Sequence, residues 1–121
     1  MADNLLETPS NLFQQIEAEI IKNPKRLSVF HWHDLPNGKE AYDPEDIVGR
    51  RTLHDIAGWI VAKTPNGPRF ERLREDVNEY ANEILRCNGR QPIPWGIFFA
   101  DEESQWNVIR RRAAEEREAG L

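Results

Sequence analysis

Three histidines and two aspartates are the residues of this chain whose types and spacing could do chemistry. His31 and His33 are separated by one residue, so on an extended segment both imidazoles project from one face, a geometry that metal sites use. His54, Asp34 or Asp55 could then complete a tetrahedral or octahedral shell. One hypothesis is therefore a metal-dependent enzyme that uses His31, His33 and His54.

The sequence offers no second signal for catalysis. It contains no H-E-x-x-H spacing, no phosphate-binding loop and no G-x-S-x-G turn. His54 and Asp55 are adjacent, and adjacent positions on a helix point about 100° apart, which disfavours an acid–base pair. We therefore predict no catalytic residue, no bound metal and no cofactor. In this interpretation Trp32 is the buried residue of its segment, and the flanking histidines lie at the surface or bond to nearby backbone.

The dense basic run of the chain is Arg110 to Arg112. Sixteen basic residues against 21 acidic ones leave a net charge of -5, which argues against a sequence-independent grip on nucleic-acid phosphates. Glu115, Glu116 and Glu118 follow the arginines at spacings that allow pairing along a helix. We therefore predict a solvated helix face whose charges neutralise one another. Nucleic-acid association through Arg110–Arg112 is the weaker alternative.

Four tryptophans are a high number for 121 residues, and so small a core is not expected to bury them all. They are Trp32, Trp59, Trp95 and Trp106. Trp95 lies in the segment PIPWG, where the prolines exclude regular helix and hold the chain stiff. Rigid exposed aromatic residues are favoured anchors for protein partners, so we predict a binding surface with Trp95, Phe98 and Trp32. The alternative is a core position for Trp95.

Small size, acidity and aromatic content, together with the lack of a catalytic pattern, favour binding over catalysis. We predict a non-enzymatic protein-binding module. It would be an accessory protein or, if a phage encodes it, an effector or inhibitor of a host protein complex. The single cysteine, Cys87, the lack of a signal-peptide pattern and the lack of a run of about 20 apolar residues predict a cytoplasmic protein without a membrane span.

Helical periodicity predicts four helices that position these residues. They begin at Thr8–Pro9, at Thr52, after the turn at 64–68 and at Asp101, and the first and third end at Asn23–Pro24 and Asn88–Gly89. The third helix is expected to place Phe70, Leu73 and Val77 on one apolar side. The chain is thus predicted to be a mainly α single small domain over residues 1–121, with frayed ends at 1–8 and 115–121.

The second helix contains four residues with expected structural roles: Thr52, Asp55, Gly58 and Trp59. The Thr52 hydroxyl is expected to accept from the backbone at Asp55, whose carboxylate lies in the first turn, where the helix dipole favours an anion. Gly58 inside a helix costs about 1 kcal/mol relative to alanine, which indicates that another backbone or a large side chain packs closely against it. Trp59 is expected to close the core or its edge.

Residues 27–50 are expected to be largely non-helical. Residues 27–33, LSVFHWH, are rich in β-branched and aromatic side chains and predict a short strand or an extended segment. Turn residues at 36–38 and 43–44 then predict an exposed loop or a small hairpin over 34–50. Loops of this length in small domains often contain functional residues.

The chain resembles a family of small uncharacterised bacterial, cyanobacterial and phage proteins with the block C-G-T-x-x-C-I-A-G-W. The matching landmarks are Asn23-Pro24, Trp32, Thr52, Ile56-Ala57-Gly58-Trp59, Pro92-Ile93-Pro94, Phe98-Phe99-Ala100, Glu103 and Ile109. They follow in the family's order over about residues 12–112, most of a domain of ordinary size. Arg50 and Asp55 replace the two cysteines of the block, so a thiol, disulfide or metal role for that pair does not apply to this chain.

Overall fold

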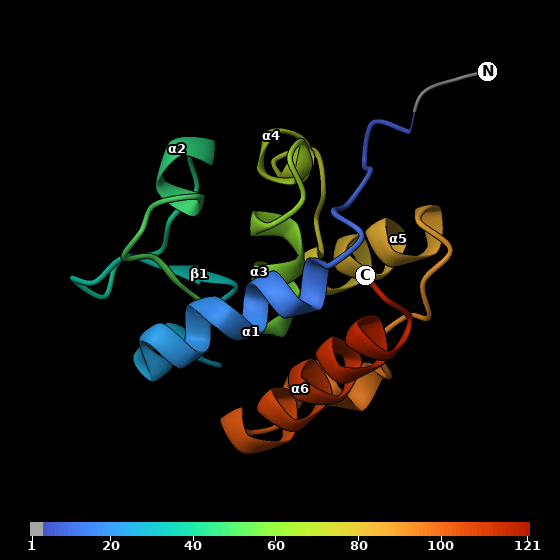
Figure 1. The fold of residues 1–121 in the computed structure, drawn as a ribbon. Helices are drawn as coiled ribbons and strands as arrows, with labels where there is room; N and C mark the ends of the chain where they lie inside the picture. Colours follow the sequence, from blue (N-terminus) through green and yellow to red (C-terminus); the bar gives the residue numbers. More distant parts are fainter. Residues whose placement is uncertain (1–3) are drawn as a thin grey trace.

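The structure is a computed structural model that describes residues 4–121 (Figure 1). Its elements are α1 (Leu12–Lys22), η1 (Pro24–Arg26), β1 (His33–Asp34), α2 (Pro44–Ile47), β2 (Leu53–His54), α3 (Ile56–Ala62), α4 (Gly67–Glu71), α5 (Val77–Cys87), η2 (Trp95–Phe99) and α6 (Glu102–Glu118). Here η marks a 3-10 helix. The elements confirm the predicted class, a mainly α small domain with a short extended segment. Within residues 4–121, no helix combines the length and the apolar character that crossing a membrane requires.

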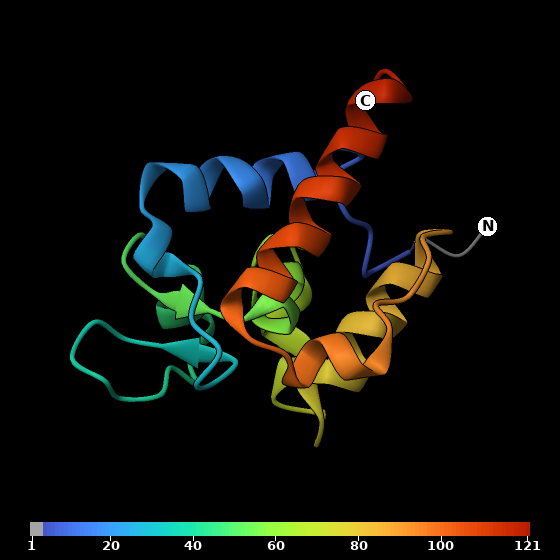
Figure 2. The ribbon, with the colours of Figure 1, turned by 90° about the horizontal axis from the view of Figure 1, so that it is seen from below.

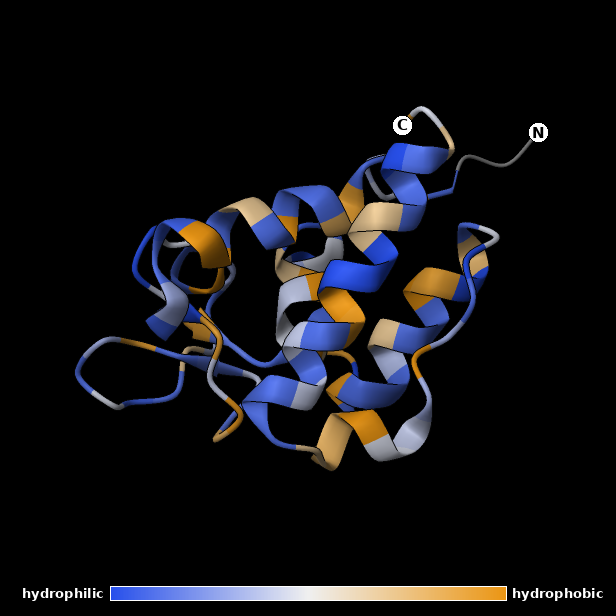
Figure 3. Ribbon diagram, turned by 60° about the horizontal axis from the view of Figure 1, so that its bottom comes forward, coloured by the Kyte–Doolittle hydropathy of each residue, from blue (hydrophilic) through white to orange (hydrophobic). Residues whose placement is uncertain are grey.

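Helix α3 lies at the centre of the fold. The helices α1, α4, α5 and α6 all contact it, and Figure 2 shows them arranged around it. All residues from Ile56 to Val61 are buried, so this helix is apolar on every side over its first six residues. By contrast, α6 is largely hydrophilic in Figure 3, which agrees with a helix that covers the core with one face only.

The prediction that another group packs closely on Gly58 is confirmed. A Cβ atom at this position would lie 1.8 Å from the backbone oxygen of Trp32 and 3.1 Å from Nδ1 of His33. Glycine therefore lets the segment before β1 touch the backbone of α3. Trp59 is fully buried beside it, and its indole N–H donates to the Arg26 backbone oxygen at 3.2 Å.

The second helix begins later than predicted. Leu53 and His54 form β2, and the helix is capped by the Asp55 carboxylate, which accepts from the Gly58 N–H at 2.8 Å. The prediction that Thr52 caps this helix is therefore wrong. Its hydroxyl instead donates to the Asp46 backbone oxygen at 2.5 Å. Asp55 does have a structural role at the start of this helix, but as its N-cap and not as a first-turn residue. The cap thus lies three residues further along the chain than predicted.

The first helix also begins later than predicted, at Leu12 instead of Thr8–Pro9. Asn11 occupies the N-cap position but its side chain makes no capping hydrogen bond. The cap comes from the other end of the chain: the Glu116 carboxylate accepts from the backbone N–H groups of Phe13 at 3.0 Å and Gln14 at 2.8 Å. An anion from α6 thus satisfies the first turn of α1.

The predicted third helix is two helices, α4 and α5. The Asp76 carboxylate accepts from the backbone N–H groups of Asn78 at 2.9 Å and Glu79 at 3.4 Å, which starts a new helix after a break. Leu73 lies in that break and is 75% exposed. Its predicted place on the apolar side of a continuous helix is therefore wrong, whereas Val77 is buried as predicted.

Residues 27–50 combine a hairpin with a short helix. β1 pairs antiparallel with β2, and an isolated bridge between Asp34 and Glu40 closes a small hairpin through Gly38, whose φ of 86° suits glycine. The prediction of an exposed loop over 34–50 is only partly right. Ala41 and Ile47 are buried, the latter in α2, because they pack back onto the domain.

The ends of the chain leave one prediction untested. Residues 1–3, within the segment expected to fray, lie outside the described residues. At the other end, α6 continues to Glu118, and the Gln14 side-chain amide donates to the Leu121 backbone oxygen at 2.9 Å. Fraying at 1–8 and 115–121 stays a prediction.

Candidate functional site

Two histidines meet in the interior where β1 pairs with β2. The strand register places His33 opposite His54, and their Nδ1 atoms lie 2.7 Å apart, within hydrogen-bond distance. The rings meet edge to face, and both residues are at most 3% exposed. Glu71 of α4 accepts a hydrogen bond from Nε2 of His33. The result is a buried line of three ionisable side chains from three elements.

His31 stands apart from this pair. Its Nδ1 contacts the Asp34 carboxylate at 2.8 Å and its Nε2 contacts the Glu40 carboxylate at 3.1 Å, with the ring half-exposed. The structure therefore brings together two of the three histidines proposed as metal ligands and not the third. Among residues 4–121 there is no group of three or more His, Cys, Asp or Glu side chains with the arrangement of a metal site.

The interpretation of Trp32 as a buried residue with the flanking histidines at the surface or on nearby backbone is right for His31, which is exposed, and wrong for Trp32 and His33. His33 is buried, and Trp32 is only partly buried, because its backbone lies against Gly58 and its side chain runs outward to α5. There the indole N–H donates to the Asn78 side-chain oxygen at 2.9 Å. Trp32 therefore joins the segment before β1 to two helices.

A cleft of about 410 Å³ opens beside this cluster. Its lining includes Phe30, Trp32, Tyr42, His33 and Glu71. Phe30 and Tyr42 are strongly exposed at its border. Neither aromatic residue was among the predicted binding residues, although Tyr42 lies in the loop 34–50, whose length suggested a functional role. His33 and Glu71 in the lining belong to the buried line of side chains, and the lining also contains His31 and Glu40, which contact each other at 3.1 Å.

Burial changes the proton affinity of two adjacent residues in opposite directions. Desolvation, reinforced by the facing His33, holds the pKa of His54 well below its usual value. Desolvation also raises the pKa of Asp55 to about 7, against the hydrogen bond that it accepts from the Gly58 N–H. Both side chains are therefore favoured in their uncharged forms inside the protein.

Asp55→Asn should change how the free energy of unfolding depends on pH. The folded protein keeps a proton on Asp55 up to about pH 7, whereas the ordinary carboxyl pKa is 3.8, so Asp55 lowers stability as pH rises through that window. Asparagine keeps an oxygen for the Gly58 N–H but does not titrate. We expect the stability of the variant relative to the unsubstituted protein to rise by more than about 1 kcal/mol between pH 5 and 8, in urea unfolding.

Asp101→Asn is the matched control for that experiment. Asp101 caps α6 in the same way, accepting from the Ser104 N–H at 2.8 Å, but it is exposed and its hydrogen bonds to Ser104 lower its pKa. It does not titrate between pH 5 and 8, so its relative stability should be constant over that range. A constant relative stability for Asp55→Asn as well would contradict the assignment of a protonated, buried Asp55.

The three proposed binding residues lie in different environments. Trp95 is 50% exposed, which contradicts the alternative that it folds into the core, and Phe98 is 5% exposed. Phe99, one residue on, is 69% exposed. The Trp95 ring meets Phe98 and Phe99 edge to face, with centroid distances of 5.5 and 5.9 Å. The exposed pair is thus Trp95 and Phe99, while Phe98 attaches η2 to the core.

The segment that presents this pair is fixed at several points. The Asn82 side chain donates to the Ile93 backbone oxygen at 3.0 Å and accepts from the Ile93 N–H at 2.7 Å. The Arg112 guanidinium donates to the Pro92 backbone oxygen at 2.9 Å, and the Gln105 amide donates to the Ile97 backbone oxygen at 3.0 Å. These hydrogen bonds fix residues 92–97 against α5 and α6, so the segment that presents Trp95 and Phe99 is held rigid.

The arginine run does not form the predicted self-neutralising face. Among residues 4–121 no ion pair joins Arg110, Arg111 or Arg112 to the glutamates that follow them. Burial lowers the pKa of Arg112, which bonds to backbone oxygens of Gln91 and Pro92. Arg110 and Arg111 remain exposed on α6.

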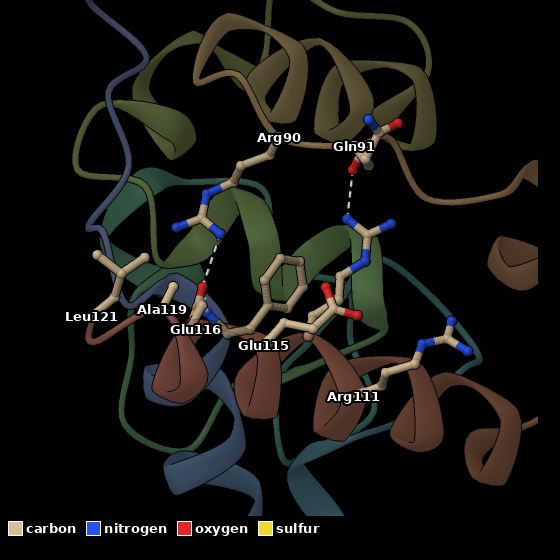
Figure 4. A pocket seen from close by; sticks show the side chains of 9 residues that line it. Arg90, Gln91, Arg111, Glu115, Glu116, Ala119 and Leu121 are labelled. Carbon is tan, nitrogen blue, oxygen red and sulfur yellow. Dashed lines mark hydrogen bonds and ion pairs between the residues drawn. The ribbon is translucent and has the colours of Figure 1, made fainter.

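A hollow of about 470 Å³, shown in Figure 4, is lined by side chains that join parts of the fold to one another. Arg90 points to Glu116 across it, at 2.8 Å, and also donates to the backbone oxygens of Pro9 and Ser10. The guanidinium groups of Arg90 and Arg112 lie 5.8 and 5.5 Å from the centre of the Phe13 ring. Arg90 and Arg112 therefore connect α1, α6 and residues 90–92 to one another.

Comparison with known proteins adds no assignment: no protein-family model matches the chain, and neither the curated proteins nor the solved structures give a match. Membership of the family with the C-G-T-x-x-C-I-A-G-W block stays a prediction.

Proposed function

We propose that the protein is a non-enzymatic protein-binding module whose contact surface is centred on Trp95 and Phe99. The observation that supports this proposal is that two neighbouring aromatic side chains are half or more exposed on a segment held rigid from three sides. Tryptophan is among the residues that contribute most to binding energy in protein interfaces. Because the segment that presents Trp95 and Phe99 is already ordered, less entropy is lost when a partner binds.

The surroundings of the pair favour a protein partner over nucleic acid. Glu102 and Glu103 are exposed in the first turn of α6, directly after η2, and the whole chain has a net charge of -5. Negative charge next to the aromatic pair repels phosphates and favours a partner whose apolar pocket is bordered by lysine or arginine. The exposed Arg110 and Arg111 are too few to reverse this preference.

The role of Phe98 differs from the one predicted. Because its side chain is buried, it contributes to the position of the contact surface and not to the contact itself. In the cell the module would act in the cytoplasm as an accessory protein or, if a phage encodes it, as an effector or inhibitor of a host protein complex. Both roles need a rigid recognition surface and no catalytic group.

Substitution of both exposed residues, Trp95→Ala with Phe99→Ala, should abolish partner binding and leave the fold intact. Affinity capture from a lysate of the producing cells would identify proteins retained by the unsubstituted chain. Affinity for the purified partner should then fall at least about 100-fold in the double variant, because two exposed aromatic anchors are lost.

Leu73→Ala is the matched control, since Leu73 is also a strongly exposed apolar residue but lies between α4 and α5. Its affinity should equal that of the unsubstituted protein, and urea unfolding should show all three proteins folded. Equal retention of every captured protein by the double variant, or substrate turnover by the pure chain, would overturn the proposal.

A further inference from the structure

A single line of hydrogen bonds joins three elements that are distant in sequence. Glu71 of α4 contacts Nε2 of His33 in β1, and Nδ1 of His33 contacts Nδ1 of His54 in β2. All three side chains are largely buried, with 12% of the Glu71 side chain exposed and less of the histidines. Besides the backbone pairing of β1 with β2, this line connects β1 to both β2 and α4 through one imidazole pair.

The number of protons decides whether this line can form. In the neutral pair, His33 donates through Nε2–H to Glu71, so its Nδ1 has a lone pair that accepts from Nδ1–H of His54. One added proton is still compatible with the line. His33 is then protonated on both nitrogens and donates from Nδ1, while His54 is neutral, carries its proton on Nε2 and accepts at Nδ1. A second added proton places N–H groups on both facing Nδ1 atoms, and no hydrogen bond can then join them.

We propose that Glu71, His33 and His54 form a histidine latch that holds β1 against β2 and α4 while one of the facing Nδ1 atoms is unprotonated, and that opens in acid. The latch lies next to the aromatic cleft, whose lining includes His33 and Glu71. Opening would release the hairpin that Phe30 and Tyr42 flank and would widen that cleft.

The charges around the pair set the pH at which the latch opens. Glu71 of α4 accepts from His33, and the cations Arg26 of η1 and Lys63, directly after α3, act on His54. Asp34 and Asp55 are the chain neighbours of the two histidines, and Asp34 and Glu71 both act on Asp55. Desolvation, the facing imidazole and the two cations all hold the pKa of His54 low. The protein thus resists the second proton near neutral pH and accepts it only in a clearly acidic solution.

Global stability is a poor measure of this latch. As pH falls below the ordinary histidine pKa of 6.5, the unfolded chain protonates His54 and stability decreases, while the raised pKa of Asp55 makes stability increase over an overlapping range. The two effects offset each other. The readout must therefore be local, and two backbone N–H groups provide it: Ser28 donates to the His54 backbone oxygen and Ala41 donates to the His33 backbone oxygen, each at 3.0 Å.

Hydrogen exchange of the Ser28 and Ala41 amides, followed by NMR in the full chain, tests the proposal. Between about pH 7.5 and pH 4.5, under conditions where tryptophan fluorescence shows a folded protein, their protection should fall by about tenfold or more after correction for intrinsic exchange. Nitrogen chemical shifts of the imidazoles should show one protonated and one unprotonated Nδ1 near neutral pH.

His54→Phe and His31→Phe form the pair of variants for this test. His54→Phe keeps a planar ring but removes the titrating group, so protection of the two amides should become independent of pH, whereas His31→Phe should behave like the unsubstituted protein. A full fall in protection in His54→Phe would overturn the latch. If His54→Phe does not fold, the unsubstituted protein still tests the latch. Protection of the Ser28 and Ala41 amides that stays constant between about pH 7.5 and pH 4.5, or protons on both facing Nδ1 atoms near neutral pH, would overturn the latch.

Discussion

Gly58→Ala should unfold the protein or cost at least about 4 kcal/mol in the free energy of unfolding. The added Cβ would lie 1.8 Å from the Trp32 backbone oxygen and 2.9 Å from the Trp32 backbone carbon. Because these are backbone atoms, no side-chain rotation can relieve the overlap, and β1 must move away from α3. Native domains are stable by about 5–15 kcal/mol, so such a loss removes much of the margin. Urea unfolding followed by tryptophan fluorescence measures it, and Gly58→Leu should be worse.

Gly96→Ala is the control for this prediction. A Cβ at Gly96 meets no atom within 4 Å, and its backbone lies outside the left-handed region. Its free energy of unfolding should stay within about 0.5 kcal/mol of the unsubstituted value. If Gly58→Ala and Gly96→Ala unfold at the same urea concentration, the Trp32 backbone does not pack against α3.

Glu116→Ala should cost about 3–5 kcal/mol, because it removes a buried carboxylate that pairs with Arg90 and also caps α1. The carboxylate is 4% exposed, pairs with Arg90 at 2.8 Å and accepts two backbone hydrogen bonds from the start of α1. The variant removes the ion pair of Arg90 and leaves the N–H groups of Phe13 and Gln14 without their acceptor. Glu116→Gln keeps an acceptor oxygen, so its loss should be smaller.

Urea unfolding gives the size of the loss, and hydrogen exchange at Phe13 and Gln14 locates it. Glu115→Ala is the matched control, since Glu115 is the exposed neighbour on the same helix and should change stability by less than about 0.5 kcal/mol. Equal stabilities for the two alanine variants would show that Glu116 is not the cap of α1.

Features governed by local physics could be read from the sequence. The spacing of Leu12, Phe13, Ile16 and Ile20 predicts the buried face of α1, and all four are buried. The Asp101 cap of α6 follows from side-chain chemistry within three residues. Even the close contact at Gly58 is visible, because a glycine inside an apolar helix is costly unless another group packs against it.

Two helix boundaries differ in how far along the chain their signals lie. The cap of α1 is Glu116, and nothing near α1 in the sequence indicates that distant carboxylate. The break before α5 had a local signal, because Asp76 precedes Glu79 by three residues, the spacing of a capping box. The regular apolar pattern across 70–85 concealed it.

Most of the candidate site depended on tertiary contacts. The stiffness of PIPWG left two positions open for Trp95, an exposed anchor or a core residue, and the fold decides for the exposed one. Which of Phe98 and Phe99 faces the core is decided by how η2 packs on α6, so the sequence pointed to the wrong one. The pairing of His33 with His54 depends on the register of two-residue strands, which no pattern in the sequence specifies.

The cap that α6 provides for α1 also bears on how the chain folds as it is synthesised. Phe13 leaves the ribosome long before Glu116, which is 103 residues further along the chain. Until then the first turn of α1 lacks its partner, and an isolated helix of 11 residues is marginal in water. Completion of α1 therefore waits for α6, so the native fold forms only after Glu116 has been synthesised.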